Sequence, residues 1–553
     1  MNYRYVTNQL ALLLVILAGV LIVVGGIGAL FEEAARQTVS KAAMQAIFIT
    51  AAAGALFGGG TWFATRFRKD SGEDLAVALA RREKKVETSS DERLVRAEDD
   101  RKRRFARLGQ REALLLVAMT WILGAAFCAL PYLLWAHLGS ESESGHHALR
   151  NFVNCYFEAM SGVTTTGATI LSDIHVIPRS LLLWRSMTHW LGGLGIVVLF
   201  VAVLPSLGVG AKKLFRAESA GPAQAGLKEK ISDHARALLY IYLAFTAIAM
   251  TSLLVAGMSL FDAVCHGFSV LSTGGFSTLD TSIGGYNSIL IESLLIVFML
   301  VAGINFQLFH QAIRSGSGAL LRDPELRVYL FLKGLGIAAV AVNLLWARQP
   351  ILTTVPGVEL DPNIGQSIRA SAFVGVAMQT GTGFCTADYN SWPFLSRSIL
   401  IGLMLVGGCA GSTAGGIKVI RFWVVLKVMA AELEKAFRPH VVRPVKITGG
   451  VIDPEYKLGA LVYVIGIIVL MFIGALVVGL LEPAADRDLR TVLTASMACL
   501  CNVGPGLGAV GPTGNYGFFS DGSKLVLSLL MALGRVEVFL ILVLFTPRFW
   551  RTA

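Results

Sequence analysis

The stretch STGGFST, residues Ser272–Thr278, decides the fold because the chain contains three more segments of the same kind. These are TTTGAT (Thr164–Thr169), TGTGFCT (Thr380–Thr386) and NVGPGLG (Asn502–Gly508). Each follows a short apolar segment that lies between two long apolar runs. A single segment would be a loop, but four at similar intervals predict four equivalent units around one axis. A ring of four Gly-bearing loops at membrane depth can replace the water around a small cation.

The composition predicts an integral membrane protein. Of the 553 residues, 54% are hydrophobic and only 15% are charged. Apolar runs such as Leu10–Leu30, Leu114–Leu134 and Leu525–Phe545 are long enough for spanning helices. They do not alternate as the strands of a barrel would. No small-residue cleavage site follows the first run, so we interpret it as a spanning helix and not as a signal peptide.

The net charge of +11 is explained by membrane topology and not by nucleic-acid binding. Cations gather in some loops and acids in others, such as Glu141–Glu143 and Glu482–Asp488. By the positive-inside rule, we expect the basic loops and both termini of this multi-pass protein to face the cytoplasm. The basic loops are Arg66–Arg111, Lys212–Arg236, Arg314–Lys333 and Lys427–Lys457.

The order of the segments predicts an all-α membrane protein. Four tandem units, each a helix, a pore helix, a loop and a second helix, are expected around one pore. Two extra transmembrane helices (residues 1–65) and a charged cytoplasmic insert (66–112) precede them. The repeats are expected at residues 113–210, 230–312, 326–430 and 455–547. We count ten spanning helices and four re-entrant ones, with second helices that include Ile289–His310 and Lys524–Phe545.

The four short apolar segments are predicted to be half-helices. They are Asn151–Gly162, Phe261–Leu271, Gln366–Gln379 and Thr491–Cys501. At 1.5 Å per residue, such segments cross only about half of the hydrocarbon. The irregular backbone that follows them survives there only where it lines a wet cavity or is buried in protein. Helix carboxyl ends that point inward favour a cation.

The loops supply oxygen ligands of the kind that suits potassium. Aligning them places Gly167, Gly274, Gly383 and Gly504 in register, and Gly permits the positive φ that turns successive carbonyls the same way. Divalent ions usually need carboxylates, and the loop centres hold none. The alternative is that Gly and Thr only allow tight helix packing. The predicted filter and potassium-binding residues are Thr165, Thr166, Gly167, Thr273, Gly274, Thr382, Gly383, Asn502, Val503 and Gly504.

The second helix of the third unit is interrupted by GGCAGSTAGG, residues Gly407–Gly416. Five glycines in ten residues do not stay helical, so the segment predicts either a kink or an intramembrane gate loop. Arg535 and Glu537 lie inside the last apolar run, where charges must face water or a partner. They are either a structural pair or part of the permeation path. The predicted gate residues are Gly407, Gly408, Gly411, Ser412, Thr413, Gly415, Gly416 and Arg535.

Three motifs carry a resemblance to a known family. The chain from about residue 110 to its end resembles the TrkH branch of the TrkH/KtrB/HKT superfamily of cation transporters. The motifs are WRSMTHWLGGLGI (Trp184–Ile196), FDAVCHGFSVLSTGGFSTLD (Phe261–Asp280) and GGCAGSTAGGIKVIR (Gly407–Arg421). The resemblance implies potassium selectivity through Gly167, a gate at Gly407–Gly416, and an arginine, here Arg535, that faces the path below the filter. It also implies a location in the bacterial inner membrane, a homodimer and a cytosolic NAD- and ATP-binding ring of the TrkA type.

Potassium uptake is therefore the expected function, with or without symport of protons or sodium. The alternatives are a non-selective or sodium-coupled cation transporter and a secondary transporter of a small organic solute. An intramembrane enzyme is not expected, because no nucleophile–base pair or metal set is found. No P-loop is present, so we expect no cofactor in this chain and place any nucleotide on the partner. Seven cysteines lack C-x-x-C spacing and read as small buried side chains. The insert is interpreted as a solvated linker, with contact of its basic clusters to anionic lipid or a partner as the alternative. Membrane lipid is an expected partner of the chain, and nucleic acid is not.

Overall fold

The computed structural model describes residues 3–34, 40–67, 110–139, 148–198, 231–440, 444–447, 450–482 and 488–551. Almost all of the insert Arg66–Arg111 lies outside these ranges, and so does most of the basic segment Lys212–Arg236. The acidic loop Glu141–Glu143 lies outside them as well. The roles predicted for these segments stay predictions.

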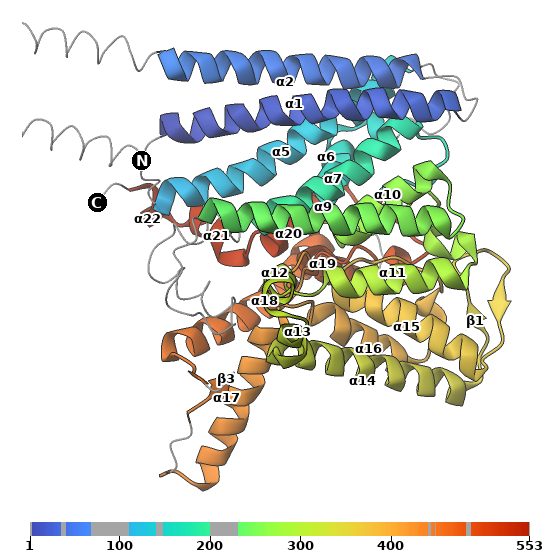
Figure 1. Ribbon diagram of the computed structural model, residues 1–553, viewed down its shortest axis with the longest axis vertical. Helices are drawn as coiled ribbons and strands as arrows, with labels where there is room; N and C mark the ends of the chain where they lie inside the picture. The colour runs from blue at the N-terminus through green and yellow to red at the C-terminus, as the bar shows by residue number, and fades with distance from the viewer. Residues whose placement is uncertain are drawn as a thin grey trace, which may run out of the picture.

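Long apolar helices form the frame of the protein. Within the described residues, six helices are long and apolar enough to cross a membrane. They are α1 (Tyr3–Ala34), α2 (Lys41–Phe67), α5 (Gln110–Leu138), α9 (Ile231–Val255), α14 (Pro324–Ala347) and α18 (Pro454–Leu481). The first two form a hairpin that packs on α5, and each of the other four opens one repeated unit. Helices α1, α2, α9 and α14 run along the same direction in Figure 1.

Each unit continues with a short helix that is capped in the same way. The short helices are α6 (Phe152–Val163), α10 (Leu260–Leu271), α15 (Ile364–Thr380) and α19 (Leu489–Cys501). A polar side chain accepts a hydrogen bond from the first turn of each helix and fixes where it begins. The capping residues are Asn151, Ser259, Asn363 and Asp488. The expected half-helices are confirmed, and they are 12 to 17 residues long.

The second helix is bent or interrupted in three of the four units. In the first unit it is α7 (Arg179–Val198). In the second unit, α11 (Ile289–Ala302) and α12 (Phe306–Ser315) meet at 88°. In the third, α16 (Phe394–Leu405) and α17 (Val419–Phe437) are separated by the Gly-rich segment. In the fourth, α20 (Asp521–Arg535) is followed by α21 (Val538–Leu542) after a bend of 120°.

Two of these interruptions correct the sequence analysis, which expected unbroken helices over Ile289–His310 and Lys524–Phe545. The first helix stops because the Asn305 side chain accepts from the Gln307 amide and starts a new helix. The second stops at Glu537, whose φ of 64° no right-handed helix permits. Neither site contains the proline that usually marks such a break.

Short elements complete the described chain. Two small antiparallel hairpins join β1 (Ile351–Leu352) to β2 (Glu359–Leu360) and β3 (Lys446–Ile447) to β4 (Gly450–Val451). The remaining helices are η1 (Ala148–Arg150), η4 (Ser282–Tyr286), α13 (Gly318–Arg322), η5 (Tyr389–Ser391), η6 (Gly508–Val510), η7 (Val543–Phe545) and α22 (Pro547–Trp550).

The four units close into a ring. Each short helix packs against the second helix of the preceding unit: α10 on α7, α15 on α11, and α19 on α16. Helix α6 of the first unit packs on α20 of the fourth and completes the circle. This circular packing confirms the predicted arrangement of four tandem units around one axis.

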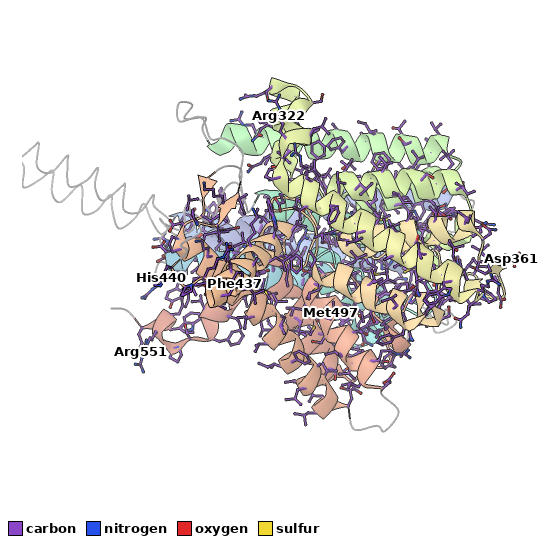
Figure 2. The ribbon with its side chains drawn as sticks, turned by 90° about the horizontal axis from the view of Figure 1, so that it is seen from below. Arg322, Asp361, Phe437, His440, Met497 and Arg551 are labelled. Atoms are coloured by element: carbon purple, nitrogen blue, oxygen red, sulfur yellow. The ribbon has the colours of Figure 1, made fainter. Side chains whose placement is uncertain are left out.

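The two ends of the molecule differ. Both termini lie at one end of the bundle, beside α22, and β1 lies at the opposite end (Figure 1). Figure 2 places His440 and Arg551 at the first end and Asp361 at the other. Between the ends, large apolar side chains such as Leu335 of α14 and Ile465 of α18 are exposed on the outer helices. A lipid bilayer is the environment that suits such a surface.

We expect Gly28→Ala in α1 to destabilise the protein. A Cβ at Gly28 would lie 2.5 Å from the Cα atom of Ser180, so α1 and α7 must move apart. Overpacking of this kind costs about 1–3 kcal/mol. Thermal unfolding in detergent should show a lower midpoint. Gly26→Ala is the matched control, since nothing lies within 4 Å of its Cβ. Equal midpoints for the two variants would contradict this packing.

Candidate functional site

The four Gly-bearing loops share one backbone conformation. Each short helix is followed within two residues by a residue with left-handed φ, whose N–H donates to the carbonyl three residues earlier. The N–H of the next residue donates to the carbonyl five residues earlier, as in a Schellman motif. The left-handed residues are Thr165 (53°), Thr273 (57°), Gly381 (73°) and Asn502 (53°). Because these amides turn back to the helix, the carbonyl oxygens carry the polar character of the loops.

A glycine with positive φ stands two residues further on in every loop. The φ values are 83° at Gly167, 83° at Gly275, 72° at Gly383 and 89° at Gly504. Left-handed backbone penalises any side chain, and glycine alone escapes the cost. The four glycines therefore mark equivalent positions.

The same glycines bring the loops into contact as a closed ring. A Cβ on Gly167 would lie 2.2 Å from the carbonyl oxygen of Gly274, so no side chain fits there. The contact repeats from loop two to three, from three to four, and from four back to one. An added Cβ would lie 1.9 Å from the Thr382 carbonyl oxygen at Gly275 and 2.0 Å from the Val503 carbonyl oxygen at Gly383. At Gly504 it would lie 2.6 Å from the Thr166 carbonyl oxygen.

The register predicted for the second loop is wrong by one residue. The glycine equivalent to Gly167, Gly383 and Gly504 is Gly275, and not Gly274. Gly274 is instead equivalent to Thr166, because the N–H of each donates to the carbonyl five residues earlier. Gly274 leaves room for His189, because an added Cβ at Gly274 would lie 2.1 Å from Nδ1 of His189. The adjacent glycines of STGGFST allowed either alignment.

The ring is buried and rich in oxygen. Threonine hydroxyls lie just below it, where Thr164 and Thr166 share a hydrogen bond of 2.7 Å. Asn502 of the fourth loop donates to the Thr166 hydroxyl at 3.0 Å and links the ends of the repeat. The Tyr516 hydroxyl donates to the Gly504 carbonyl at 2.7 Å and holds the last loop. In the described chain no group of three or more acidic, His or Cys side chains forms a metal site.

A hollow opens on one side of the ring. Its volume is about 560 Å³ with the open mouth included, and Gly167, Gly275, Gly383 and Gly504 all line it. Arg185 and Asp280 are the charged residues in its wall. A small cation that entered this hollow would meet all four loops at once.

The segment Gly407–Gly416 forms a folded loop and not a simple kink. Its flanks pair with each other: the Gly407 N–H donates to Ile417, and the Ile417 N–H donates to Leu405, both at 3.0 Å. The buried carboxylate of Glu325 accepts from the amides of Ala410 (2.8 Å) and Ile420 (3.2 Å). Both sides of the loop are thereby attached to the start of α14.

The bend between α11 and α12 receives this loop. The Cys409 N–H donates to the Gly303 carbonyl at 2.9 Å, and the Phe306 N–H donates to the Gly411 carbonyl at 3.2 Å. The break in the second unit thus supplies the peptide groups that satisfy the Gly-rich loop of the third.

Thr413 brings the Gly-rich loop against the ring. Its carbonyl accepts from the Thr273 hydroxyl at 3.0 Å and from Nη1 of Arg535 at 2.6 Å. Nη2 of Arg535 donates to Gly192 at 3.1 Å. Glu537 does not pair with Arg535 but accepts from Arg421 at 2.8 Å. The structural Arg535–Glu537 pair, one of the alternatives from the sequence, is therefore wrong.

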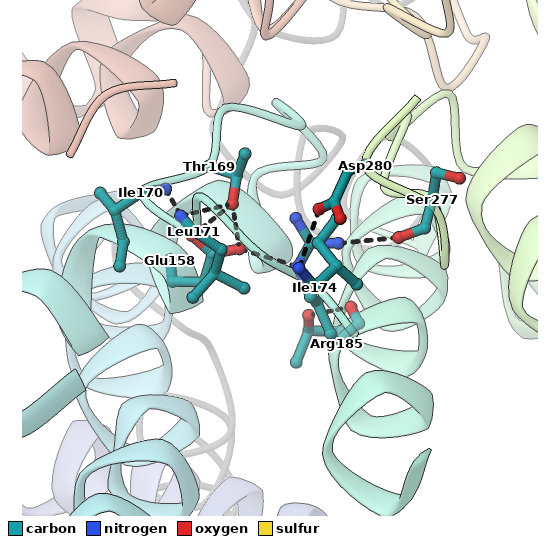
Figure 3. Close-up of polar contacts among 9 residues, drawn as sticks. Glu158, Thr169, Ile170, Leu171, Ile174, Arg185, Ser277 and Asp280 are labelled. Carbon is teal, nitrogen blue, oxygen red and sulfur yellow. Dashed lines mark hydrogen bonds and ion pairs between the residues drawn. The ribbon is translucent and has the colours of Figure 1, made fainter. Parts of the chain in front are cut away.

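The sequence analysis missed a buried ion pair beside the first loop (Figure 3). Nε of Arg185 lies 2.7 Å from Oε1 of Glu158, and both side chains are at most 3% exposed. Glu158 also accepts from the Thr169 hydroxyl and from the Ile170 amide at 3.0 Å each. The available signal was two charges within apolar segments, which membrane proteins place only with a partner.

All seven cysteines are free and buried, as their spacing predicted. None of them contributes a ligand cluster in the described chain.

Comparison with known proteins agrees with this geometry. A family model described as TrkH, cation transport protein, matches residues 110–552. The Trk system potassium uptake protein TrkH of Escherichia coli K12 is 32% identical over 554 residues, with 100% of both chains covered. Its counterpart in Halomonas elongata is 37% identical over 80% of this chain and 87% of the relative. The crystal structure of the potassium transporter TrkH from Vibrio parahaemolyticus matches with a TM-score of 0.77, at 28% identity and 100% coverage of both chains.

Gly275→Ala should destabilise the protein more than Gly257→Ala. Both glycines have positive φ, 83° and 101°, so both variants carry the left-handed penalty of about 1–2 kcal/mol. Only at Gly275 would the Cβ also meet a backbone oxygen, while nothing lies within 4 Å at Gly257. Thermal unfolding midpoints of the two variants measure the difference. A Gly275 variant as stable as the Gly257 variant would show that the ring is not closed at this point.

Proposed function

The chain belongs to the TrkH family of cation transport proteins, and we propose that it takes up potassium through the ring of four loops. Family membership confirms the expectation of a cation transporter and not an enzyme. The observation that carries the proposal is the closed circle of carbonyl-to-glycine contacts at Gly167, Gly275, Gly383 and Gly504.

The chemistry of the ring favours potassium. Neutral carbonyl and hydroxyl oxygens replace the hydration shell of a monovalent cation. A divalent ion would need carboxylates, which the four loops lack. We assign the filter to the predicted residues, with Gly275 added in the second loop. The short helices end at the ring, so the negative ends of their dipoles point toward the ion.

We assign the gate to the Gly407–Gly416 loop and Arg535. The loop lies directly against the ring at Thr413, and its residues are buried. The guanidinium of Arg535 adds a positive charge on the same side. An ion leaving the ring would meet both. Opening therefore requires the loop to exchange the hydrogen bonds that now hold it.

We place the end of the molecule that carries both termini in the cytoplasm. The basic residues of the described part of that end, such as Arg551, support this orientation by the positive-inside rule. Uptake would then follow the membrane potential, which is worth about 2.3 kcal/mol per charge per 100 mV. A second copy of the chain and a nucleotide-binding ring of the TrkA type are the proposed partners, since the relatives are named as Trk system proteins.

Uptake of rubidium into liposomes tests the proposal. Purified chain is reconstituted, and an outward proton gradient with a protonophore sets an inside-negative potential that external potassium does not collapse. We expect uptake that excess potassium abolishes and that equal sodium leaves nearly unchanged. Uptake equal to that of protein-free liposomes would overturn the proposed function.

Gly167→Ser should let sodium compete with potassium. The serine Cβ would lie 2.2 Å from the Gly274 carbonyl and would displace it from the ring. A ring of altered size discriminates less between the two ions. Rubidium uptake with increasing external sodium measures the change, and we expect about tenfold stronger inhibition, equivalent to about 1.4 kcal/mol. Unchanged ion ratios would count against the filter assignment.

Arg535→Ala should raise uptake in the absence of any partner. The change removes both the charge below the ring and the hydrogen bonds to Thr413 and Gly192. Initial rates of rubidium uptake measure the effect. Arg535→Lys keeps the positive charge but lacks the two guanidinium nitrogens that donate to Thr413 and Gly192, and it should give an intermediate rate. Identical rates in all three proteins would leave Arg535 with a structural role only.

A further inference from the structure

The pair Glu158–Arg185 connects the first two loops of the ring. Glu158 on α6 holds the first loop through Thr169 and Ile170. Arg185 on α7 holds the second loop, because its Nη1 donates to the Ser277 carbonyl at 3.2 Å. Figure 3 shows these contacts side by side. Through the 2.7 Å ion pair, the two loops share one support.

Arg185 also contacts the second loop through the aromatic ring of Phe276. Its guanidinium carbon lies 3.4 Å from the centre of the Phe276 ring. His189, one turn later on α7, stacks on Phe276 with ring centres 4.0 Å apart. Phe276 directly follows Gly275 of the ring. Any shift of Arg185 is therefore transmitted to the carbonyls around that glycine.

At the position of Glu158 in the short helix, a polar side chain bonds to the following loop in only the first two of the four units. Glu158 lies seven residues before the left-handed Thr165 and bonds Thr169, four residues after it. In the second loop the same positions are His266 and Ser277, which are 3.0 Å apart. The third and fourth units have Val374 and Ala495 at the position of Glu158. Polar braces at this position therefore serve only the first two loops.

We propose that Glu158 and Arg185 are positioning residues that set the ion preference of the ring. The proposal deepens the proposed function and rests on it. As a pair the two charges cancel, so they add rigidity without a net field at the hollow that Arg185 lines. A single charge left there would act on every cation that reaches the ring.

This arrangement predicts opposite effects for the two partners. Arg185→Gln leaves the Glu158 carboxylate uncompensated, and it should attract potassium and sodium alike. Glu158→Gln leaves the Arg185 cation uncompensated, and it should repel both ions. In each variant the shared support is lost, so the preference for rubidium over sodium should fall.

The experiment measures the KM for rubidium uptake and the rubidium-to-sodium rate ratio in liposomes. We expect Arg185→Gln to lower the KM and Glu158→Gln to raise it, by several-fold each. The double variant Glu158→Gln/Arg185→Gln should return the KM toward the wild-type value while the ion ratio stays low. Arg185→Lys, which keeps the charge but not the fork, should keep the KM and lower the ratio.

Arg369→Gln is the matched control. Arg369 forms another ion pair, 2.7 Å from Glu292, which does not contact the ring glycines in the described structure. We expect this variant to lose stability without a change in the ion ratio. A merely structural role for Glu158 and Arg185 would make their variants behave in the same way.

The outcomes distinguish a failure of the proposed function from a failure of the positioning role. If wild-type protein fails to take up rubidium, the proposed function is wrong. If wild-type uptake is selective but both single variants shift the KM in the same direction, the positioning role is overturned. Should Glu158→Gln not fold, the ion ratio of Arg185→Lys decides, and a wild-type ratio rejects the proposal.

Discussion

Peptide groups inside a membrane must find their partners within the protein, and this constraint governs the whole structure. Half-helices leave amides and carbonyls unpaired at their ends. Here the amides turn back onto the helix at Thr165, Thr273, Gly381 and Asn502, and carbonyl oxygens of the loops lie against the glycines of the neighbouring loops. The same constraint joins the breaks elsewhere in the fold. The Gly-rich loop of the third unit is satisfied by the bend of the second, through Cys409 and Gly303.

The ring and the loop beneath it form one hydrogen-bonded system. Thr413 accepts from the second filter loop and from Arg535 of the fourth unit, while Glu325 holds both sides of the Gly-rich loop. A movement of this loop therefore changes the support of the ring itself. Under the proposed assignment of filter and gate, conduction and selectivity would be coupled through these shared backbone contacts.

Much of the fold follows from the sequence because long apolar runs and polar interruptions are strong signals. The four units, the half-helices and the Gly-rich loop were predictable from these patterns alone. The register of Gly274 and Gly275 was not, because only contact with Thr382 distinguishes two adjacent glycines. The helix break near Asn305 has a local signal, because Asn305 caps the helix that follows by accepting from the Gln307 amide. The break at Glu537 is accompanied by a tertiary bond to Arg421, which local propensity does not encode. Glu158 and Arg185 were visible as charges in apolar segments, but their pairing depends on how α6 meets α7.

The left-handed position is occupied by threonine in the first two loops, by glycine in the third and by asparagine in the fourth. These residues are Thr165, Thr273, Gly381 and Asn502. A symmetric assembly of four identical chains cannot have such variety, because each mutation alters all quadrants together. A single polypeptide changes one quadrant at a time. If the ring is the ion filter that we propose, a substitution in one loop changes one quarter of the ion's surroundings and leaves the other three unchanged.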